Sequence, residues 1–308
     1  MNHQILFDSR WSGTHGIGRF SAEVRRRMPT GVTDLTGAHP VSPRGMVETE
    51  VKPHLLGLRE RDTTFFSPGY TPSLSWRGRL AFTVHDLIHL DVPGEASPVK
   101  DAYYEHVVRR AVRRPDAVVL TVSEFSRQRI AEWAGVDPAR ITWVGNGVDQ
   151  SFSPEGRRIQ RARAYVLNVG NTKPHKNLGR LLTAISTIPD VELVLSSAPD
   201  QVLVEQARQL NIEDRLVFLS GIPEKDLPAW FRGASAVAIP SLYEGFGLPA
   251  LEGMASGVPV VASIGGALEE VVGDAGVLVD PANVDSIRDG LTRALSESPL
   301  RKELALRG

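Results

Sequence analysis

The sequence predicts an α/β protein of two Rossmann-like domains, each a doubly wound parallel sheet, that face one cleft. Its 308 residues exceed what one hydrophobic core usually serves. Short apolar runs alternate with segments of helical spacing in both halves, which is the pattern of repeated βαβ units. Several of these runs end in Gly-rich polar loops, as expected where parallel strands meet a ligand site.

Composition and charge restrict the class of protein. Hydrophobic residues make up 42% and charged residues 23%, as in ordinary soluble globular proteins. With a formal net charge of −1, neither half has the basic excess that nucleic-acid binding needs. The absence of cysteine excludes disulfides, thiolate metal sites and a cysteine nucleophile. Neither a signal peptide nor an apolar run long enough to span a bilayer is found, so a cytoplasmic protein is expected.

Apolar runs predict the strands of the first half. They are ILFDS at 5–9, TTFFS at 63–67, RLAFTV at 79–84, AVVLTV at 117–122 and, as a strand that ends in a turn, ITWVGNGVD at 141–149. Helices are expected after the Gly-rich loop that begins at Ser12, over 98–114, and over 124–134 with Ser123 as N-cap. Residues 30–62 combine Pro, Gly and charges with little period, which predicts weak or irregular structure.

A polar segment, QSFSPEGRRIQRARA at 150–164, has no apolar period and predicts the interdomain linker. We therefore place the domains at 1–157 and 158–308. Beyond the linker, YVLNVG, VELVLSS, RLVFLSG and AVAIP are predicted strands separated by helical segments. Near the end of the chain, one helix is expected to about Ser296 and a second after Pro299.

The segment from 240 to 263, PSLYEGFGLPALEGMASGVPVVAS, predicts a loop entering a helix after the strand AVAIP. Glycine lets the loop backbone approach a ligand, and the first helical N–H groups suit a phosphate. The residues predicted to form this binding surface are Gly245, Phe246, Gly247 and Leu248.

Two glutamates lie eight residues apart in the same segment. Glu244 is expected on the loop and Glu252 about one turn into the helix, so both can face one cleft. The alternative is that both are solvated surface charges. The apolar neighbours of Glu252 argue against that alternative, because a carboxylate in such a setting needs a partner.

The strand YVLNVG leads into NTKPHKN and a further helix pattern, which predicts a second phosphate site. Lys176 is expected at the start of this helix, where a cation and the helix dipole act together on a diphosphate. Gly170, Asn171 and Lys173 complete the predicted site. The segment is not a Walker A loop, since it lacks the Gly-Lys-Ser/Thr ending.

The first half contributes candidate residues at the ends of strands. RLAFTV runs directly into His85 and Asp86, and ligands bind beyond the carboxyl ends of strands in doubly wound sheets. The alternative is a structural histidine and an aspartate that caps the next turn. Gly16 and Arg19 are predicted in a loop that lines the cleft, and the alternative is that Arg19 opens a solvated helix.

Four arginines, Arg109, Arg110, Arg113 and Arg114, are spaced to form one basic helical face. Such a face is either a solvated surface or a site that contacts an anionic membrane carrying a lipid-linked acceptor.

EGFGLPALE, followed by SGVPVVAS and GGALEEVVGDAGVLVDP, resembles the donor-site signature of the retaining glycosyltransferases of family 4, which have the GT-B fold. The resemblance implies that Glu244 contacts the donor sugar and that Glu252 holds the nucleotide ribose. TVHDL resembles the family segment whose histidine, here His85, approaches the sugar. Lys176 matches the lysine that neutralises the departing diphosphate. The family often has Arg where this chain has Asn171, which leaves open whether Lys173, an arginine of the other domain or no residue replaces that charge.

The resemblance implies a retaining hexosyltransferase that moves a hexose from a nucleotide diphosphate sugar to a hydroxyl of a glycan, lipid-linked or small-molecule acceptor. Lys176 and the helix N-terminus stabilise the leaving diphosphate, while Glu244 and His85 orient the sugar. Gly16 and Arg19 meet the acceptor or the donor phosphates. Mannose from GDP-mannose is the expected donor, with rhamnose and glucose as alternatives. No Asp-x-Asp motif lies near the site, so metal independence and no cofactor are expected.

Two other functions stay open. A GT-B nucleotide-sugar 2-epimerase would share the fold and the ligand but need no acceptor. An inactive sugar-nucleotide-binding subunit is suggested by Asn171. A Rossmann dehydrogenase is disfavoured, because no strand is followed by Gly-x-Gly-x-x-Gly. The family's final helical segment, which crosses back to the N-terminal domain, is expected to be absent because the chain stops at Gly308. A mobile hinge or a covering partner chain would follow.

Overall fold

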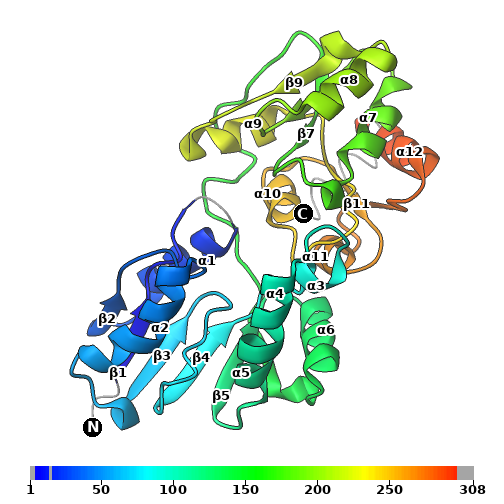
Figure 1. The fold of residues 1–308 in the computed structure, drawn as a ribbon. Helices are drawn as coiled ribbons and strands as arrows, with labels where there is room; N and C mark the ends of the chain where they lie inside the picture. The colour runs from blue at the N-terminus through cyan, green and yellow to red at the C-terminus, as the bar shows by residue number, and fades with distance from the viewer. Residues whose placement is uncertain (1–3, 14–15, 297–308) are drawn as a thin grey trace. The chain divides into compact units, whose positions relative to one another are not determined.

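Every strand among the described residues belongs to one of two six-stranded parallel sheets (Figure 1). The computed structural model describes residues 4–13 and 16–296. The chain divides into two compact units, Met1–Asn146 and Gly147–Gly308, and each unit contains one sheet. The predicted α/β architecture of two Rossmann-like domains is therefore confirmed, and the expectation that they face one cleft stays a prediction.

The first unit is built on a sheet with the strand order β2-β1-β3-β4-β5-β6. Neighbouring strands are parallel, with Leu6 beside Phe65 in the register of β1 and β3. The strands are β1 Gln4–Asp8, β2 Val32–Leu35, β3 Thr63–Ser67, β4 Arg79–Thr83, β5 Ala117–Thr121 and β6 Ile141–Trp143. The helices are α1 Gly16–Arg27, α2 Pro43–Leu55, α3 Ile88–Asp91, α4 Pro98–Tyr103, the π turn η2 Tyr104–Val108, α5 Arg109–Arg113 and α6 Glu124–Ala134.

Most of the predicted elements of this unit are present. The helix expected over 98–114 is formed by α4, η2 and α5 in direct succession. Ser123 caps α6 as predicted, because its Oγ accepts a hydrogen bond from the backbone N–H of Ser126. Gly135 ends the helix with a φ of 66°, a left-handed conformation that glycine adopts without steric cost.

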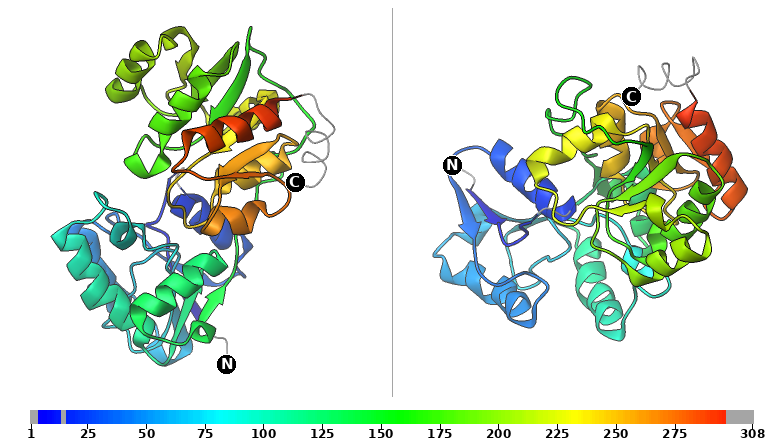
Figure 2. Two further views of the ribbon diagram at one scale, coloured as in Figure 1. Left: turned by 90° about the vertical axis from the view of Figure 1, so that its right-hand side faces the viewer. Right: turned by 90° about the horizontal axis from the view of Figure 1, so that it is seen from above.

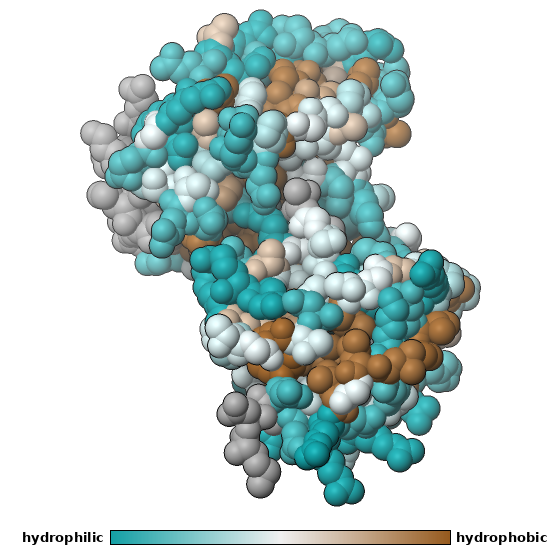
Figure 3. Space-filling view, turned by 90° about the vertical axis from the view of Figure 1, so that its left-hand side faces the viewer, coloured by the Kyte–Doolittle hydropathy of each residue, from teal (hydrophilic) through white to brown (hydrophobic). Residues whose placement is uncertain are grey.

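The prediction of irregular structure over 30–62 is wrong, because β2 and α2 lie there. Ser42 caps α2 through its Oγ, which accepts from the backbone N–H of Gly45. The sequence of α2 lacks the apolar stripe that indicates a helix, since its buried residues include the polar Glu48 and Thr49. Its solvent side instead carries Val47, which is 62% exposed, together with exposed Val51 and Leu55. Figure 3 shows hydrophobic surface gathered on one face of the first unit.

The second unit has the strand order β12-β11-β10-β7-β8-β9, again all parallel. The strands are β7 Ala164–Asn168, β8 Val191–Leu195, β9 Leu216–Phe218, β10 Ala236–Ile239, β11 Val260–Ser263 and β12 Val277–Val279. The helices are α7 Leu178–Ser186, α8 Gln201–Gln209, α9 Leu227–Gly233, α10 Leu248–Ala255, α11 Ala267–Val272 and α12 Val284–Leu295. The 3₁₀ turn η4 Pro174–Lys176 precedes α7.

Two apolar clusters cover the two faces of this second sheet. Val166 of β7 belongs to the cluster with α7, α8 and α12, whereas its neighbours Tyr165 and Leu167 belong to the cluster with α9, α10 and α11. This alternation follows from the period of two along a strand. Because both faces are buried, the strands are mostly apolar, and Figure 2 shows the helices flanking the sheet.

The two units divide after Asn146, N-terminal to the boundary predicted between 157 and 158. The polar segment that follows is bound to the second unit. Phe152 is 6% exposed and lies in the core beside Phe231, with ring centroids 5.4 Å apart. The guanidinium of Arg232 donates hydrogen bonds to the backbone carbonyls of Ser151 and Arg157. The helix predicted after Pro299 lies outside the described residues.

Candidate active site

The order of strands in the second unit places the two predicted phosphate segments side by side. The chain continues from β7 to β8 on one side, whereas β10 lies on the other side of β7. Loops that follow two such strands diverge to opposite faces of the sheet, and the crevice between them is where doubly wound proteins bind ligands. The loop after β7 carries Lys176, and the loop after β10 carries Glu244.

Lys176 and Glu244 contact each other directly. The Nζ atom of Lys176 lies 2.6 Å from Oε1 of Glu244, and the two side chains are 16% and 15% exposed. The hydroxyl of Ser241 donates to the same carboxylate oxygen at 2.7 Å. The site therefore pairs a cation with a carboxylate at the edge of the sheet. Ser241 was not predicted from the sequence, because nothing in its surroundings distinguishes it from other loop serines.

Hydrogen bonds outside this ion pair tie the same loops together. The backbone N–H of Leu242 donates to the carbonyl of His175 at 2.7 Å. The side-chain amide of Asn177 donates to the carbonyl of Pro240 at 2.9 Å. The hydroxyl of Ser263, at the end of β11, donates to the carbonyl of Ser241 at 2.6 Å. Asn177 is a second residue that sequence reasoning missed.

The loop after β7 begins at Gly170, whose φ of 149° lies in the range that favours glycine. The Gly170 N–H donates to Ser196 Oγ at 3.1 Å. Asn171 accepts a hydrogen bond from the Lys173 backbone N–H at 3.1 Å, so its side chain closes a local turn. Both Asn171 and Lys173 are exposed. Their predicted roles toward a diphosphate stay predictions.

The loop after β10 ends at Gly247, the N-cap residue of α10, with a φ of 101°. An added Cβ atom would lie 2.4 Å from Cδ2 of Leu268, so the leucine side chain would have to shift. Gly245 is buried, while Phe246 and Leu248 are partly exposed. The helix start expected at Leu248 is confirmed, and its first N–H groups lie beside the loop of Glu244.

Glu252 lies in the second turn of α10 and is fully buried. This agrees with its apolar sequence neighbours. The adjacent Gly253 packs against the sheet, since a Cβ atom there would lie 2.9 Å from a methyl group of Val260. Ribose binding by Glu252 stays a prediction.

His85, Gly16 and Arg19 belong to the first unit. His85 follows β4 by two residues and is 9% exposed. Its Nε2 lies 2.9 Å from the carbonyl oxygen of Pro68, which can only accept, so Nε2 carries the hydrogen. The ring packs edge-on against Phe20 of α1, with centroids 4.9 Å apart. The ring of His85 is thus held by Pro68, which follows β3, and by Phe20 of α1.

Gly16 is the first residue of α1 and is exposed, and Arg19 is partly buried one turn later. Gly18, which lies between them in the sequence, packs closely against Gly13. A Cβ atom at Gly18 would lie 2.3 Å from the carbonyl oxygen of Gly13. Gly13 therefore lies close to the first turn of α1. Contact of Gly16 and Arg19 with an acceptor or a phosphate stays a prediction.

Three of the four arginines on the predicted basic face bind groups of the first unit. Arg109 forms an ion pair with Glu105 at 2.7 Å. Arg113 donates to the last carbonyl of α6, at Ala134. Arg114 pairs with Asp116 and also donates to the carbonyls of Trp76 and Gly78. Arg110 is exposed. Most of this face thus has a structural role, and membrane contact stays a prediction.

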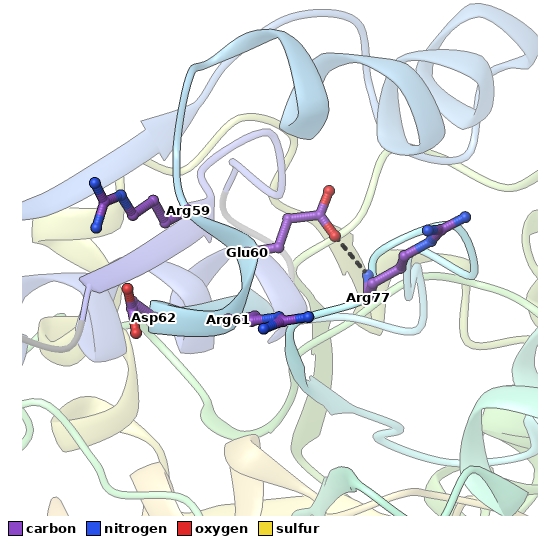
Figure 4. Close-up of a pocket in the computed structure, with 5 residues that line it drawn as sticks. All are labelled: Arg59, Glu60, Arg61, Asp62 and Arg77. Atoms are coloured by element: carbon purple, nitrogen blue, oxygen red, sulfur yellow. Dashed lines mark hydrogen bonds between the residues drawn. The ribbon is translucent and has the colours of Figure 1, made fainter.

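A hollow of about 630 Å³ lies elsewhere in the first unit (Figure 4). Arg59, Glu60, Arg61, Asp62 and Arg77 line it. These residues precede β3 and β4, so the hollow lies at the amino ends of the strands, opposite to the edge that binds ligands in such sheets. Glu60 accepts a hydrogen bond from the Arg77 backbone N–H at 3.0 Å, as the dashed line in Figure 4 marks. We assign no function to it.

Within residues 4–13 and 16–296, no helix is long and apolar enough to cross a membrane. The same residues contain no group of three or more His, Asp or Glu side chains arranged to hold a metal ion.

Fold and site together define the class, which is a doubly wound α/β protein of the GT-B type. The Anabaena protein HepE, solved in complex with UDP and glucose, has the same fold, with a TM-score of 0.71 and 18% identity over 98% of this chain and 92% of that one. The family model described as Glycosyl transferases group 1 matches residues 149–308, and the model described as Glycosyltransferase Family 4 matches residues 61–152. The chain belongs to the glycosyl transferases of group 1.

Two curated relatives agree with this family. O-antigen chain mannosyltransferase B from Escherichia coli is 32% identical over 75% of this chain and 65% of its own length. MMP alpha-(1->4)-mannosyltransferase from Mycolicibacterium hassiacum is 35% identical over 71% of this chain and 57% of its own length. The chain therefore spans less than two thirds of either relative.

Proposed function

We propose that this protein is a retaining glycosyltransferase that moves a hexose from a nucleotide diphosphate sugar to a hydroxyl acceptor. The observation that carries the proposal is the meeting of Lys176 and Glu244 where the strand order reverses in the second unit. Cleavage of the anomeric bond places negative charge on the diphosphate and positive charge on the sugar. A cation beside a carboxylate matches this separation of charge.

Each residue has a defined task in this proposal. Lys176 and the first N–H groups of α10 neutralise the leaving diphosphate, because a helix N-terminus carries a partial positive charge. Glu244 accepts hydrogen bonds from sugar hydroxyls, and Glu252 accepts them from the ribose. His85 approaches the sugar from the first unit. Its Nε2–H is engaged with Pro68, and this bond fixes the orientation of the ring.

The donor proposed is GDP-mannose, supported by the two relatives that are named mannosyltransferases. The acceptor is a glycan, lipid-linked or small-molecule hydroxyl. Metal independence is part of the proposal, since Lys176 and backbone N–H groups supply the positive charge at the diphosphate. Addition of EDTA is expected to leave turnover unchanged.

A thermal-shift panel with GDP, UDP, ADP and dTDP tests the donor site. A ligand present at about 100 times its dissociation constant adds about 2.7 kcal/mol to the free energy of unfolding, which raises the melting temperature measurably. One nucleotide is expected to stabilise the protein more than the other three. No shift with any of them would refute the donor site.

Acceptor dependence separates transfer from its two alternatives. Nucleotide release from the donor that rises with added acceptor supports a transferase, whereas conversion of the donor sugar without acceptor identifies a 2-epimerase. Binding without turnover over a broad acceptor panel identifies an inactive binding subunit.

Contact with an anionic membrane through Arg109, Arg110, Arg113 and Arg114 is tested by co-sedimentation with phosphatidylglycerol vesicles. Arg110 and Arg113 are the two of these four that are exposed and form no ion pair in the described structure, and Arg113 already donates to the carbonyl of Ala134. Arg110→Glu is therefore expected to lower vesicle binding. Equal binding of the variant and the parent protein would remove this helix from the proposal.

A further inference from the structure

Asn177 stands out among the residues around the ion pair because of its backbone conformation and its burial. Its φ of 59° and ψ of 30° are left-handed, and it is only 5% exposed. Non-glycine residues rarely adopt this conformation, and asparagine does so more readily than most. The residue directly follows Lys176 and directly precedes α7.

The side-chain amide of Asn177 joins three loops of the second unit. Nδ2 donates to the carbonyl of Pro240 at 2.9 Å and to the carbonyl of Pro281 at 2.7 Å. Oδ1 accepts from Nη1 of Arg180 at 2.9 Å. The orientation of the amide is fixed by these partners, because a carbonyl cannot donate and a guanidinium cannot accept. The loops that follow β7, β10 and β12 therefore meet at one side chain.

Two bonds to the Glu244 loop flank Lys176 in sequence. Asn177 binds the carbonyl at the start of that loop, and the His175 carbonyl accepts from the N–H of Leu242. The backbone on both sides of Lys176 is thus fixed to the segment that carries Glu244. This double attachment limits how far the backbone of Lys176 can move from the loop that carries Glu244.

We propose that Asn177 is a positioning residue that sets the geometry of Lys176 and Glu244 for the diphosphate of the donor. The inference rests on the proposed function. No other residue type supplies the same combination. Glycine adopts the conformation but lacks the amide, and aspartate would present an acceptor to two carbonyls.

The chain contains a matched control. Asn211 has a φ of 57°, nearly the same as that of Asn177, but it is exposed and its side chain makes no hydrogen bond in the described part of the chain. Asn177→Gly and Asn211→Gly both keep a backbone that tolerates the left-handed conformation. Only the first removes hydrogen bonds between loops.

Titration calorimetry measures the affinity of each variant for one nucleoside diphosphate. The diphosphate used is the one that gives the largest thermal shift with the unaltered protein. Asn177→Gly is expected to lower its affinity roughly tenfold or more, since two hydrogen bonds between loops are lost. Asn211→Gly is expected to bind as the parent protein does. Unchanged affinity in Asn177→Gly would overturn the proposal.

A double-substitution cycle shows whether Asn177 acts through Lys176. In a Lys176→Ala background, Asn177→Gly is expected to have little further effect on affinity, because the group that it positions is gone. A purely structural role predicts the same loss in both backgrounds. Additive losses would therefore overturn the proposal.

Hydrogen–deuterium exchange of the Leu242 amide tests the inference without any nucleotide. Exchange is expected to be faster in Asn177→Gly and unchanged in Asn211→Gly, because the first loosens the segment from 240 to 247. If Asn177→Gly does not fold, Asn177→Asp replaces it, since aspartate repels the carbonyls of Pro240 and Pro281 while it keeps nearly the same shape. Unchanged exchange in a folded variant would overturn the proposal. If the parent protein binds none of the four nucleotides, the proposed function is refuted. The exchange rate of the Leu242 amide would still show whether Asn177 holds the segment from 240 to 247 in place.

Discussion

The Nζ atom of Lys176 lies 2.6 Å from Oε1 of Glu244, although 68 residues separate them in the sequence. Both side chains are mostly buried, so solvent screens their attraction less than it would at the surface. Each group therefore sets the electrostatic environment of the other, and the substitutions below separate their roles.

Lys176→Ala is expected to weaken binding of a nucleoside diphosphate roughly tenfold or more, and that of the monophosphate less. A charged hydrogen bond contributes about 1.5–3 kcal/mol, and the second phosphate adds the charge that the lysine meets. Titration calorimetry with both nucleotides measures the difference. Lys225→Ala, which removes an exposed lysine outside the predicted site, is the control and should show a smaller loss. Equal losses of affinity for the two nucleotides would show that Lys176 does not act on the second phosphate.

Glu244→Ala is expected to lower turnover at least tenfold without lowering the affinity for the free nucleoside diphosphate. The carboxylate is assigned to the sugar, and its removal leaves Lys176 free to bind phosphate. Initial rates and calorimetry on the same preparation provide the two quantities. Ser241→Ala removes only the hydroxyl that donates to Glu244 and should have a smaller effect on turnover. A loss of nucleotide affinity would show that Glu244 acts on the nucleotide.

Glu252→Ala is expected to weaken nucleotide binding roughly tenfold to a hundredfold, because it removes a charged acceptor from the ribose hydroxyls. Glu252→Gln keeps the size of the side chain and one acceptor, so its loss should be smaller. Melting temperatures are measured in parallel, since the residue is fully buried. A lower melting temperature with unchanged affinity would place Glu252 in the core and not in the site.

Gly247→Ala is expected to destabilise the protein by more than about 1 kcal/mol and to lower nucleotide binding. The added methyl group would overlap Leu268, and the φ of 101° is itself unfavourable for alanine. Gly31→Ala is the matched control, because Gly31 has a φ of 92° but no atom within 4 Å of an added Cβ. Urea unfolding of both variants separates backbone strain from overlap. Equal destabilisation would remove Leu268 from the explanation.

Ionisation of the Tyr70 hydroxyl is expected to lower the free energy of unfolding at alkaline pH. Burial and the nearby Asp86 carboxylate raise the pKa of Tyr70 to about 12, above the value of about 10 in an unfolded chain. The folded state therefore keeps the proton longer, so its contribution is full below pH 10 and is lost as the pH rises toward 12. Between about pH 9 and about pH 11, Tyr70→Phe should lose less stability in urea unfolding than the parent protein. Equal losses would contradict the assignment.

Periodicity was sufficient to predict strands that are buried on both faces, because β10 is a continuous apolar run and β7 and β8 each have only one polar residue, Asn168 and Glu192. It failed for α2, whose buried side includes Glu48 and Thr49 while Val47 and Leu55 face solvent. Such a helix is held by hydrogen bonds and ion pairs of its polar residues, and a search for apolar stripes does not detect it.

Some residues of the candidate site could likewise be predicted from the sequence, and others could not. Lys176 and Glu244 could be predicted, because Gly-rich loops after apolar runs and a family signature both point to them. Asn177 could not, since its partners lie 63 and 104 residues away and no local spacing indicates them. The role of Ser241 likewise depends on the folded course of the loop that carries it.

The two groups to which Asn177 Nδ2 donates are main-chain carbonyls, and this affects how the family can vary in sequence. Every amino acid supplies a backbone carbonyl, so the residues at positions 240 and 281 can change during evolution without loss of these bonds. For these two bonds the constraint falls on position 177, where both a left-handed backbone and a primary amide are required. We therefore expect homologous sequences to drift at 240 and 281 while they retain asparagine at 177.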